Sequence, residues 1–116
     1  MRKILQPLKN KKAVVSGRIE NVVYKNKLDK NHTSKINVNI LLKEVIINGV
    51  EIDHIWLSER NKYYKEYRKA INKRIKFKGK VEPYIKKDGI IYKEDYGIKR
   101  ESKIYMEADY NEQFKK

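Results

Sequence analysis

The chain has 116 residues, a formal net charge of +14 and no cysteine. This composition excludes disulfide bridges and thiolate zinc sites, and the length predicts one domain with one modest core. So large an excess of cations favours an anionic partner such as nucleic acid.

Residues 1–12 are predicted to form a basic N-terminal arm with a small apolar patch. The apolar run Ile4–Leu5 ends at Pro7, which makes it too short for a signal peptide. No window of the sequence approaches the roughly 20 apolar residues of a membrane span. We therefore expect a cytoplasmic protein without a membrane partner.

A long strand is predicted over residues 13–24, "AVVSGRIENVVY". Gly17 and a slip in the alternation near Asn21 predict a bend or bulge within it. A polar loop over residues 25–34 follows.

Residues 35–57 predict a β-hairpin around Asn48-Gly49, the preferred pair for a two-residue type I′ turn. That turn sets Leu41 opposite Trp56 and Lys43 opposite His54. One face is continuously aliphatic and is expected to be core: Ile36, Val38, Ile40, Leu42, Ile55 and Leu57. The other face is mixed, and we expect it to be a half-solvated contact surface: Asn37, Asn39, Leu41, Lys43, Val45, Ile47, Val50, Ile52, His54 and Trp56.

The second half of the chain predicts a helix, then two strands. Residues 58–72 have an apolar stripe at helical spacing. In residues 74–81, apolar positions alternate with Arg74, Lys76, Lys78 and Lys80, so a strand would bury one row and expose four cations. Residues 86–89 predict a turn, residues 90–95 a loop or short extension, and residues 96–106 a last strand. The tail, residues 107–116, is expected to fray or to form a short helix.

This order of elements over residues 13–106 resembles the OB-fold. The run "INKRIKFKGKV", residues 71–81, resembles the helix exit and fourth strand of that family. The resemblance implies a mainly β protein: a five-stranded Greek-key barrel with one helix between strands three and four. "DHIWL" and "DYGIKR" are further similar to small OB-fold proteins of plasmids, phages and other mobile elements. That likeness implies a role accessory to a replication enzyme such as a polymerase, primase or helicase.

Catalytic motifs are absent from the sequence. It contains no phosphate-cradling glycine loop, no His-Glu-x-x-His helix and no G-x-S-x-G turn. Asp53 and His54 are expected on opposite faces of their strand, which would prevent a dyad. We therefore expect no enzymatic activity and no cofactor. Glu44, Glu51 and Asp53 share a face near the hairpin tip, where they either hold a divalent cation or form a solvated tip.

Binding features are stronger, because aromatic platforms and cationic grooves are what single-stranded nucleic acid requires. Trp56 is the best platform candidate, unless it is a core residue. Tyr84 and Tyr92 either join it or pack against the barrel rim. The Arg74–Lys80 row faces phosphates or is a solvated face. The complete candidate set is Asn39, Leu41, Lys43, His54, Trp56, Lys25, Lys27, Lys30, Lys35, Arg74, Lys76, Lys78, Lys80, Tyr84, Lys86, Lys87, Tyr92 and Lys93.

The function expected from these features is non-enzymatic binding of single-stranded nucleic acid, with DNA favoured and weak sequence preference. One alternative is a basic OB-fold RNA-binding protein. Another is a protein-interaction module or inhibitor that acts on a polymerase, helicase or nuclease and presents aliphatic residues such as Val45 and Ile52.

Overall fold

The computed structural model describes residues 3–114, so the ends of the predicted arm (residues 1–2) and tail (residues 115–116) lie outside the described residues. The elements in chain order are the 3₁₀-helix η1 (Lys3–Leu8), β1 (Lys12–Tyr24), η2 (Lys27–Asp29), β2 (Ile36–Ile47), β3 (Val50–Arg60), η3 (Asn61–Tyr63), α1 (Tyr64–Lys69), β4 (Arg74–Asp88), β5 (Ile91–Arg100), β6 (Tyr105–Met106) and α2 (Glu107–Gln113). No helix within residues 3–114 is long and apolar enough to cross a membrane.

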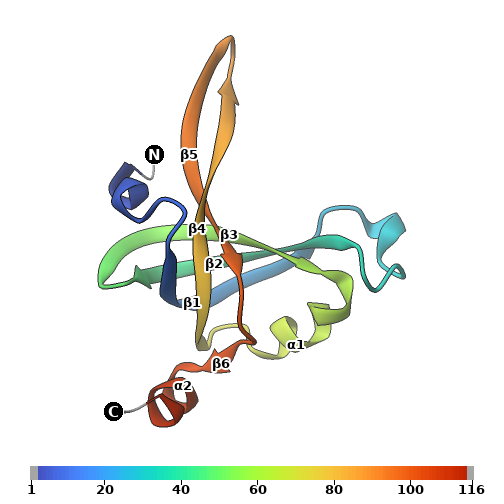
Figure 1. Ribbon diagram of the computed structural model, residues 1–116. Coiled ribbons are helices and arrows are strands. Elements are labelled where there is room, and N and C mark those ends of the chain that lie inside the picture. Colours follow the sequence, from blue (N-terminus) through green and yellow to red (C-terminus); the bar gives the residue numbers. More distant parts are fainter. Residues whose placement is uncertain (1–2, 115–116) are drawn as a thin grey trace.

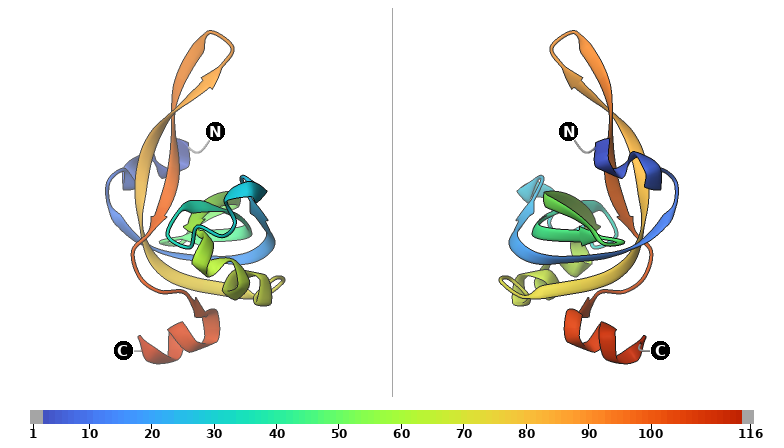
Figure 2. Two further views of the ribbon diagram at one scale, coloured as in Figure 1. Left: turned by 90° about the vertical axis from the view of Figure 1, so that its right-hand side faces the viewer. Right: turned by 90° about the vertical axis from the view of Figure 1, so that its left-hand side faces the viewer.

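The strands form an antiparallel sheet in the order β3-β2-β1-β4-β5, with the short β6 paired to β4. The expectation of a mainly β fold is confirmed. β3 and β5 lie against each other, but the ladder of paired strands does not continue between them. The β4–β5 hairpin projects from one end of the body, and α2 lies at the other end (Figures 1 and 2).

The β2–β3 hairpin has the predicted turn and register. Asn48 and Gly49 both have positive φ, 47° and 84°, as a type I′ turn requires. Leu41 lies opposite Trp56. The turn is also fixed to β1, because the Asn48 side chain accepts a 2.8 Å hydrogen bond from the Val14 amide.

The predicted faces of this hairpin are wrong near the turn. Val45 is 1% exposed and Ile47 is fully buried, although both were expected on the contact surface. The cause is a bulge: Glu44 has φ 52°, and the pairing of β1 with β2 skips between Ser16 and Arg18. A bulge shifts the alternation by one residue. Val45 is therefore a core residue and is not available to a protein partner.

A second error lies at the start of β2. Ile36, expected in the core, is exposed, whereas Asn37 is buried. The pairing of β2 with β3 is irregular between Ile36 and Val38. The buried Asn37 amide donates to the Asn26 carbonyl at 2.8 Å and accepts from the Asn26 amide at 2.9 Å. These two bonds satisfy the polar group and fix the start of the β1–β2 connection.

The alternation predicted for β4 is confirmed: Ile75, Phe77, Gly79 and Val81 are buried. A Cβ atom at Gly79 would lie 2.9 Å from the Lys99 carbonyl oxygen, so β5 can approach β4 closely only at a glycine. The irregularities predicted for β1 are also confirmed, because its pairing with β2 shifts at Gly17 and again between Ile19 and Asn21.

The predicted helix over residues 58–72 is too long. β3 continues to Arg60, because the Glu59 side chain turns inward to meet Arg100, and α1 begins only at Tyr64. Tyr67 of the predicted apolar stripe is buried, as expected.

The predicted last strand is displaced. Residues 91–95, expected as a loop or short extension, belong to β5, and the turn contracts to Gly89 and Ile90. β5 ends at Arg100, where the chain turns back and the amides of Glu101 and Ser102 donate to the Lys78 carbonyl. Of the two alternatives for the tail, the structure has the short helix, α2.

The N-terminal segment is attached to the body. Leu5 of η1 is fully buried in the core, and Lys9 forms a 3.1 Å ion pair with Glu94 of β5. The described part of the predicted basic arm is thus a helical turn anchored by its apolar patch.

Candidate nucleic-acid interface

The outer face of β2 and β3 carries three cross-strand pairs, in which every residue except Ser58 is a predicted candidate. From one end to the other these are Asn39–Ser58, Leu41–Trp56 and Lys43–His54. The Trp56 indole is 46% exposed, so its predicted position on the surface is confirmed. β1 extends the face, because Asn21 lies opposite Leu41 and Val23 opposite Asn39.

Trp56 shares a groove with Tyr84, which comes from a different hairpin. The groove encloses about 260 Å³ between β3 and β5 and is lined by Ile55, Trp56, Ser58, Tyr84, Tyr96, Gly97 and Ile98. The Tyr84 ring is 43% exposed. The fold thus places two half-exposed aromatic rings on one groove.

The Tyr84 ring is fixed at the groove by β5. The ring packs over Gly97, where an added Cβ atom would lie in ordinary van der Waals contact with it at 3.6 Å. The Tyr84 hydroxyl donates to the Asp95 carboxylate at 3.2 Å, and that buried carboxylate also accepts a 2.8 Å bond from the Tyr96 amide. A ring held in this way loses little conformational entropy when a planar ligand stacks on it.

A second hollow, of about 370 Å³, is lined by His54 of β3 and Lys86 of β4. Glu51, Asp53 and Asp95 also line it. Lys86 is the one candidate of the β4–β5 hairpin that lies at this hollow; its cross-strand neighbour Lys93 lies on β5.

The prediction that Asp53 and His54 point to opposite faces is wrong. His54 Nδ1 lies 2.9 Å from Asp53 Oδ2, and this hydrogen bond lowers the pKa of the Asp53 carboxyl below its usual value. The alternation of β3 shifts here: the half-buried Ile52 and the buried Ile55 flank the pair, which leaves both polar side chains exposed.

The remaining candidates of the β4–β5 hairpin lie on its projecting part (Figure 2). The Lys87 ammonium lies 5.9 Å from the centre of the Tyr92 ring. Ile85, Ile90 and Ile91 of this hairpin are exposed too, and Ile90 at the turn is 95% exposed. Tyr92 is exposed as well, but it lies on the projecting β4–β5 hairpin and does not line the groove of Trp56.

The loop between β1 and β2 is ordered at the other end of β3. The Asn61 amide donates to the carbonyls of Asp29 and His32, each at 2.8 Å. Lys35 donates a 2.7 Å hydrogen bond to Asp29, which lowers the pKa of that carboxyl. The candidates Lys25, Lys27 and Lys30 are exposed on this loop, whereas Lys35 is engaged in its ion pair.

The cationic row occupies residues 74–80 of β4, and these four cations do not line the Trp56 groove, to which β4 contributes Tyr84. Its residues face β1, with Arg74 opposite Arg18, Lys76 opposite Ser16, Lys78 opposite Val14 and Lys80 opposite Lys12. α2 packs beside this row: Arg74 forms a 3.0 Å ion pair with Glu107, and Lys76 donates a 2.7 Å hydrogen bond to Asn111. The row and Trp56 therefore do not form one surface.

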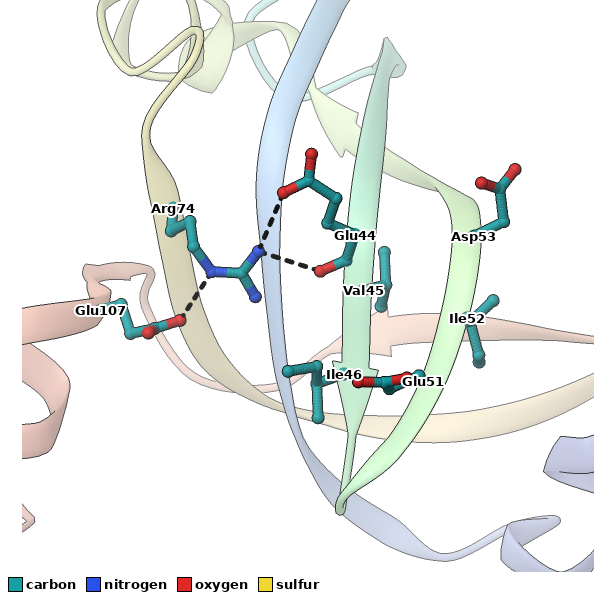
Figure 3. A pocket seen from close by; sticks show the side chains of 8 residues that line it. All are labelled: Glu44, Val45, Ile46, Glu51, Ile52, Asp53, Arg74 and Glu107. Carbon is teal, nitrogen blue, oxygen red and sulfur yellow. Dashed lines mark hydrogen bonds and ion pairs between the residues drawn. The ribbon is translucent and has the colours of Figure 1, made fainter.

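The acidic residues of the hairpin tip line a hollow of about 480 Å³ (Figure 3). Arg74 reaches into it between Glu107 on one side and Glu44 on the other. Arg18 also forms an ion pair with Glu44, at 3.3 Å. Within the described residues no group of three or more His, Asp or Glu side chains is placed to hold a metal ion.

Sequence reasoning missed Ser58, Tyr96 and Gly97 as lining residues of the groove. Ser58 was assigned to the predicted helix, and only its pairing with Asn39 places it on the floor. No local pattern marks Gly97, because its role comes from the ring that packs over it. Comparisons with family models, curated proteins and solved structures found no match to this chain.

Proposed function

We propose that the chain is a non-enzymatic binder of single-stranded nucleic acid, with DNA favoured over RNA and with weak sequence preference. The observation that carries this proposal is the groove that Trp56 and Tyr84 share. Base–aromatic stacking contributes about 1–3 kcal/mol per base and tolerates any base, because every base has a π-face. Two rings on one groove would hold two bases.

The arrangement of strands supports an OB-like architecture for this binder. The order β3-β2-β1-β4-β5, with β3 beside β5 and α1 between β3 and β4, is consistent with a partly open five-stranded barrel. In such barrels the face of strands two and three and the loops at its ends bind oligonucleotides. Trp56 comes from the third strand, and its groove extends from there to β4 and β5.

Cations at both ends of the face support contacts to the phosphate backbone. Lys43 and Lys86 lie near His54 at one end, and the exposed Lys25, Lys27 and Lys30 lie on the loop at the other. Contacts to phosphates give affinity without sequence information. This is the basis for the expected weak sequence preference.

The test is fluorescence anisotropy with a labelled oligo-dT, a matched oligo-U and a duplex of the same length, across a salt series. Trp56→Ala and Tyr84→Ala are each expected to weaken oligo-dT binding by about 5- to 150-fold, which corresponds to one stacked base. Tyr84→Phe should keep the stacking. The matched control is Ile46→Ala, which removes an exposed apolar side chain from β2 away from the groove.

Equal affinity of Trp56→Ala, Tyr84→Ala and Ile46→Ala for oligo-dT would reject the groove as the binding site. Tighter binding of oligo-U than of oligo-dT would favour the RNA-binding alternative. Binding of the duplex as tight as that of the single strand would indicate charge attraction without stacking.

The projecting β4–β5 hairpin favours a second candidate function. In this function the chain is a module that docks on a protein such as a polymerase, helicase or nuclease. Ile85, Ile90 and Ile91 are all exposed on the projecting hairpin, and an exposed apolar patch marks a site of protein interaction. Binding through them should survive high salt and fail in Ile90→Ser/Ile91→Ser. Phosphate-driven binding should instead fall steeply as salt rises.

A further inference from the structure

The C-terminal helix α2 covers the cationic row of β4. Besides the Arg74–Glu107 ion pair and the Lys76–Asn111 hydrogen bond, two ring contacts join the helix to the row. The Lys76 ammonium lies 5.2 Å from the centre of the Tyr110 ring, and the Lys78 ammonium lies 4.3 Å from that of Phe114. Three consecutive cations of the row are thus engaged by one short segment.

The contact is complementary in charge. Residues 107–113 include Glu107, Asp109 and Glu112 and no basic residue, in a chain whose net charge is +14. The Glu107 carboxylate accepts hydrogen bonds from the Ser16 hydroxyl and from the Arg74 guanidinium. A hydroxyl and a guanidinium on one oxyanion are the donors that also bind a backbone phosphate.

The attachment of α2 to the body is slight. Its chain leaves β5 through residues 101–104, which form no helix or strand, and pairs with β4 again through the two-residue β6. Tyr110 is the buried residue of α2, and the Phe114 ring that follows is 40% exposed. Segments with few buried apolar contacts open at a small free-energy cost compared with global unfolding.

We propose that α2 is a displaceable acidic cover over a second phosphate-binding surface, formed by Arg74, Lys76 and Lys78, on which the backbone of single-stranded nucleic acid replaces the helix. The inference rests on the proposed function for the identity of the anion. It adds a second binding surface on β4, which β2 and β1 separate from β3 in the strand order. Competition between α2 and the nucleic acid regulates binding to this surface.

The competition has a predictable dependence on salt. When α2 is displaced, up to three cations become available to phosphates. Each neutralised phosphate of a single strand adds about 0.7 to the slope of log affinity against log salt concentration. Full use of the surface would therefore steepen the slope by about 2.

The test compares two variants that change the net charge equally. Glu107→Gln removes the carboxylate that Arg74 and Ser16 bind, whereas Glu66→Gln removes an exposed carboxylate of α1. Because an ion pair of this kind is worth up to about 1 kcal/mol, Glu107→Gln should bind oligo-dT about two- to fivefold more tightly than Glu66→Gln, with a steeper salt slope. Equal affinities and slopes for the two variants would overturn the proposal.

A direct readout is amide hydrogen exchange of residues 107–113 in the wild-type protein. Addition of saturating oligo-dT should reduce their protection; unchanged or increased protection would overturn the proposal. Both measurements are repeated with Trp56→Ala. If the groove proposal fails, Trp56→Ala will bind as the wild type does, yet Glu107→Gln will still differ from Glu66→Gln. If the proposal that α2 is a displaceable cover fails, Glu107→Gln and Glu66→Gln will bind oligo-dT equally, whatever the affinity of Trp56→Ala.

Discussion

The carboxylate of Glu59 on β3 accepts hydrogen bonds from the guanidinium of Arg100 on β5, the bond from Nη2 being 3.1 Å long. The Tyr67 hydroxyl of α1 donates to the same carboxylate. Within the described residues no ladder of backbone hydrogen bonds joins β3 to β5. This buried cluster therefore links the two strands that form the walls of the Trp56–Tyr84 groove.

Arg100→Leu should lower the free energy of unfolding by about 3–5 kcal/mol, because it leaves the buried Glu59 carboxylate without its cation. The matched control is Arg60→Leu at the exposed end of β3, where a change within about 0.5 kcal/mol is expected. Urea unfolding followed by circular dichroism measures both. Losses of equal size in the two variants would mean that the pair does not stabilise the junction.

Stability should also decline at alkaline pH through Tyr67. Burial, and then the negative charge of Glu59, raise the pKa of this phenol above the ordinary value of 10.0. The protonated phenol is thus favoured in the folded state, so its contribution is complete below pH 10 and is lost as pH rises further. Between pH 10 and 11 the free energy of unfolding should fall by up to about 1.4 kcal/mol per pH unit from this group.

The variant Tyr67→Phe isolates this contribution. Its free energy of unfolding should be lower at pH 8, because Glu59 loses a donor, but it should depend less on pH between 10 and 11. Urea titrations at four pH values would measure both quantities. A parallel decline in the two proteins would assign the alkaline loss to other tyrosines.

Acid should release α2 from the sheet. The hydrogen bond from Ser16, and then Arg74, lower the pKa of the Glu107 carboxyl. A lowered pKa in the folded state means that the stabilisation is present above the ordinary value of 4.5 and is lost as pH falls through the folded-state value. Amide signals of residues 107–113 should therefore lose their folded shifts at a pH below 4.5, before the core unfolds.

Glu107→Gln is the control for this acid transition, because its amide does not titrate. In this variant the signals of residues 107–113 should change little between pH 6 and pH 3. A transition that remains at the same pH would show that a different carboxyl controls the helix.

The two turn glycines should differ in their effect on stability. Gly49 and Gly89 have φ of 84° and 64°, and a Cβ atom on either would meet no atom within 4 Å. Alanine at either position would therefore add only backbone strain, about 1–2 kcal/mol. Gly49→Ala strains the β2–β3 turn, which follows the buried Ile47 and is hydrogen-bonded to β1, so it should lower global stability in urea.

Gly89→Ala is the matched change on the projecting hairpin. That hairpin extends from the body, so its strain should increase hydrogen exchange of residues 84–95 and leave the urea midpoint nearly unchanged (Figure 1). A lower midpoint in Gly89→Ala as large as that in Gly49→Ala would show that the arm unfolds together with the core.

Local rules predicted much of the fold. The Asn48-Gly49 pair predicted the turn and the register of Leu41 with Trp56, because two successive residues with positive φ admit few alternatives. The alternation in residues 74–81 predicted which side of β4 is buried. Both patterns involve residues close together along the chain.

Errors occurred where a local break in the backbone changed the pattern. The left-handed conformation of Glu44 moved Val45 and Ile47 into the core. A glutamate gives no sequence signal for this conformation, because positive φ is uncommon outside glycine and asparagine. The inward turn of Glu59 extended β3 into the predicted helix. That residue requires Arg100, which is distant along the chain, before its burial becomes favourable.

The sequence by itself determined the β-rich architecture, the exposure of Trp56 and the cationic side of β4, because side-chain alternation and turn chemistry act between neighbouring residues. Only the tertiary structure decided that Tyr84 shares the groove of Trp56 and that α2 covers Arg74, Lys76 and Lys78. Those contacts join residues far apart along the chain. They depend on how the sheet bends at the bulges of the β1–β2 pairing and where β5 approaches β4 closely at Gly79.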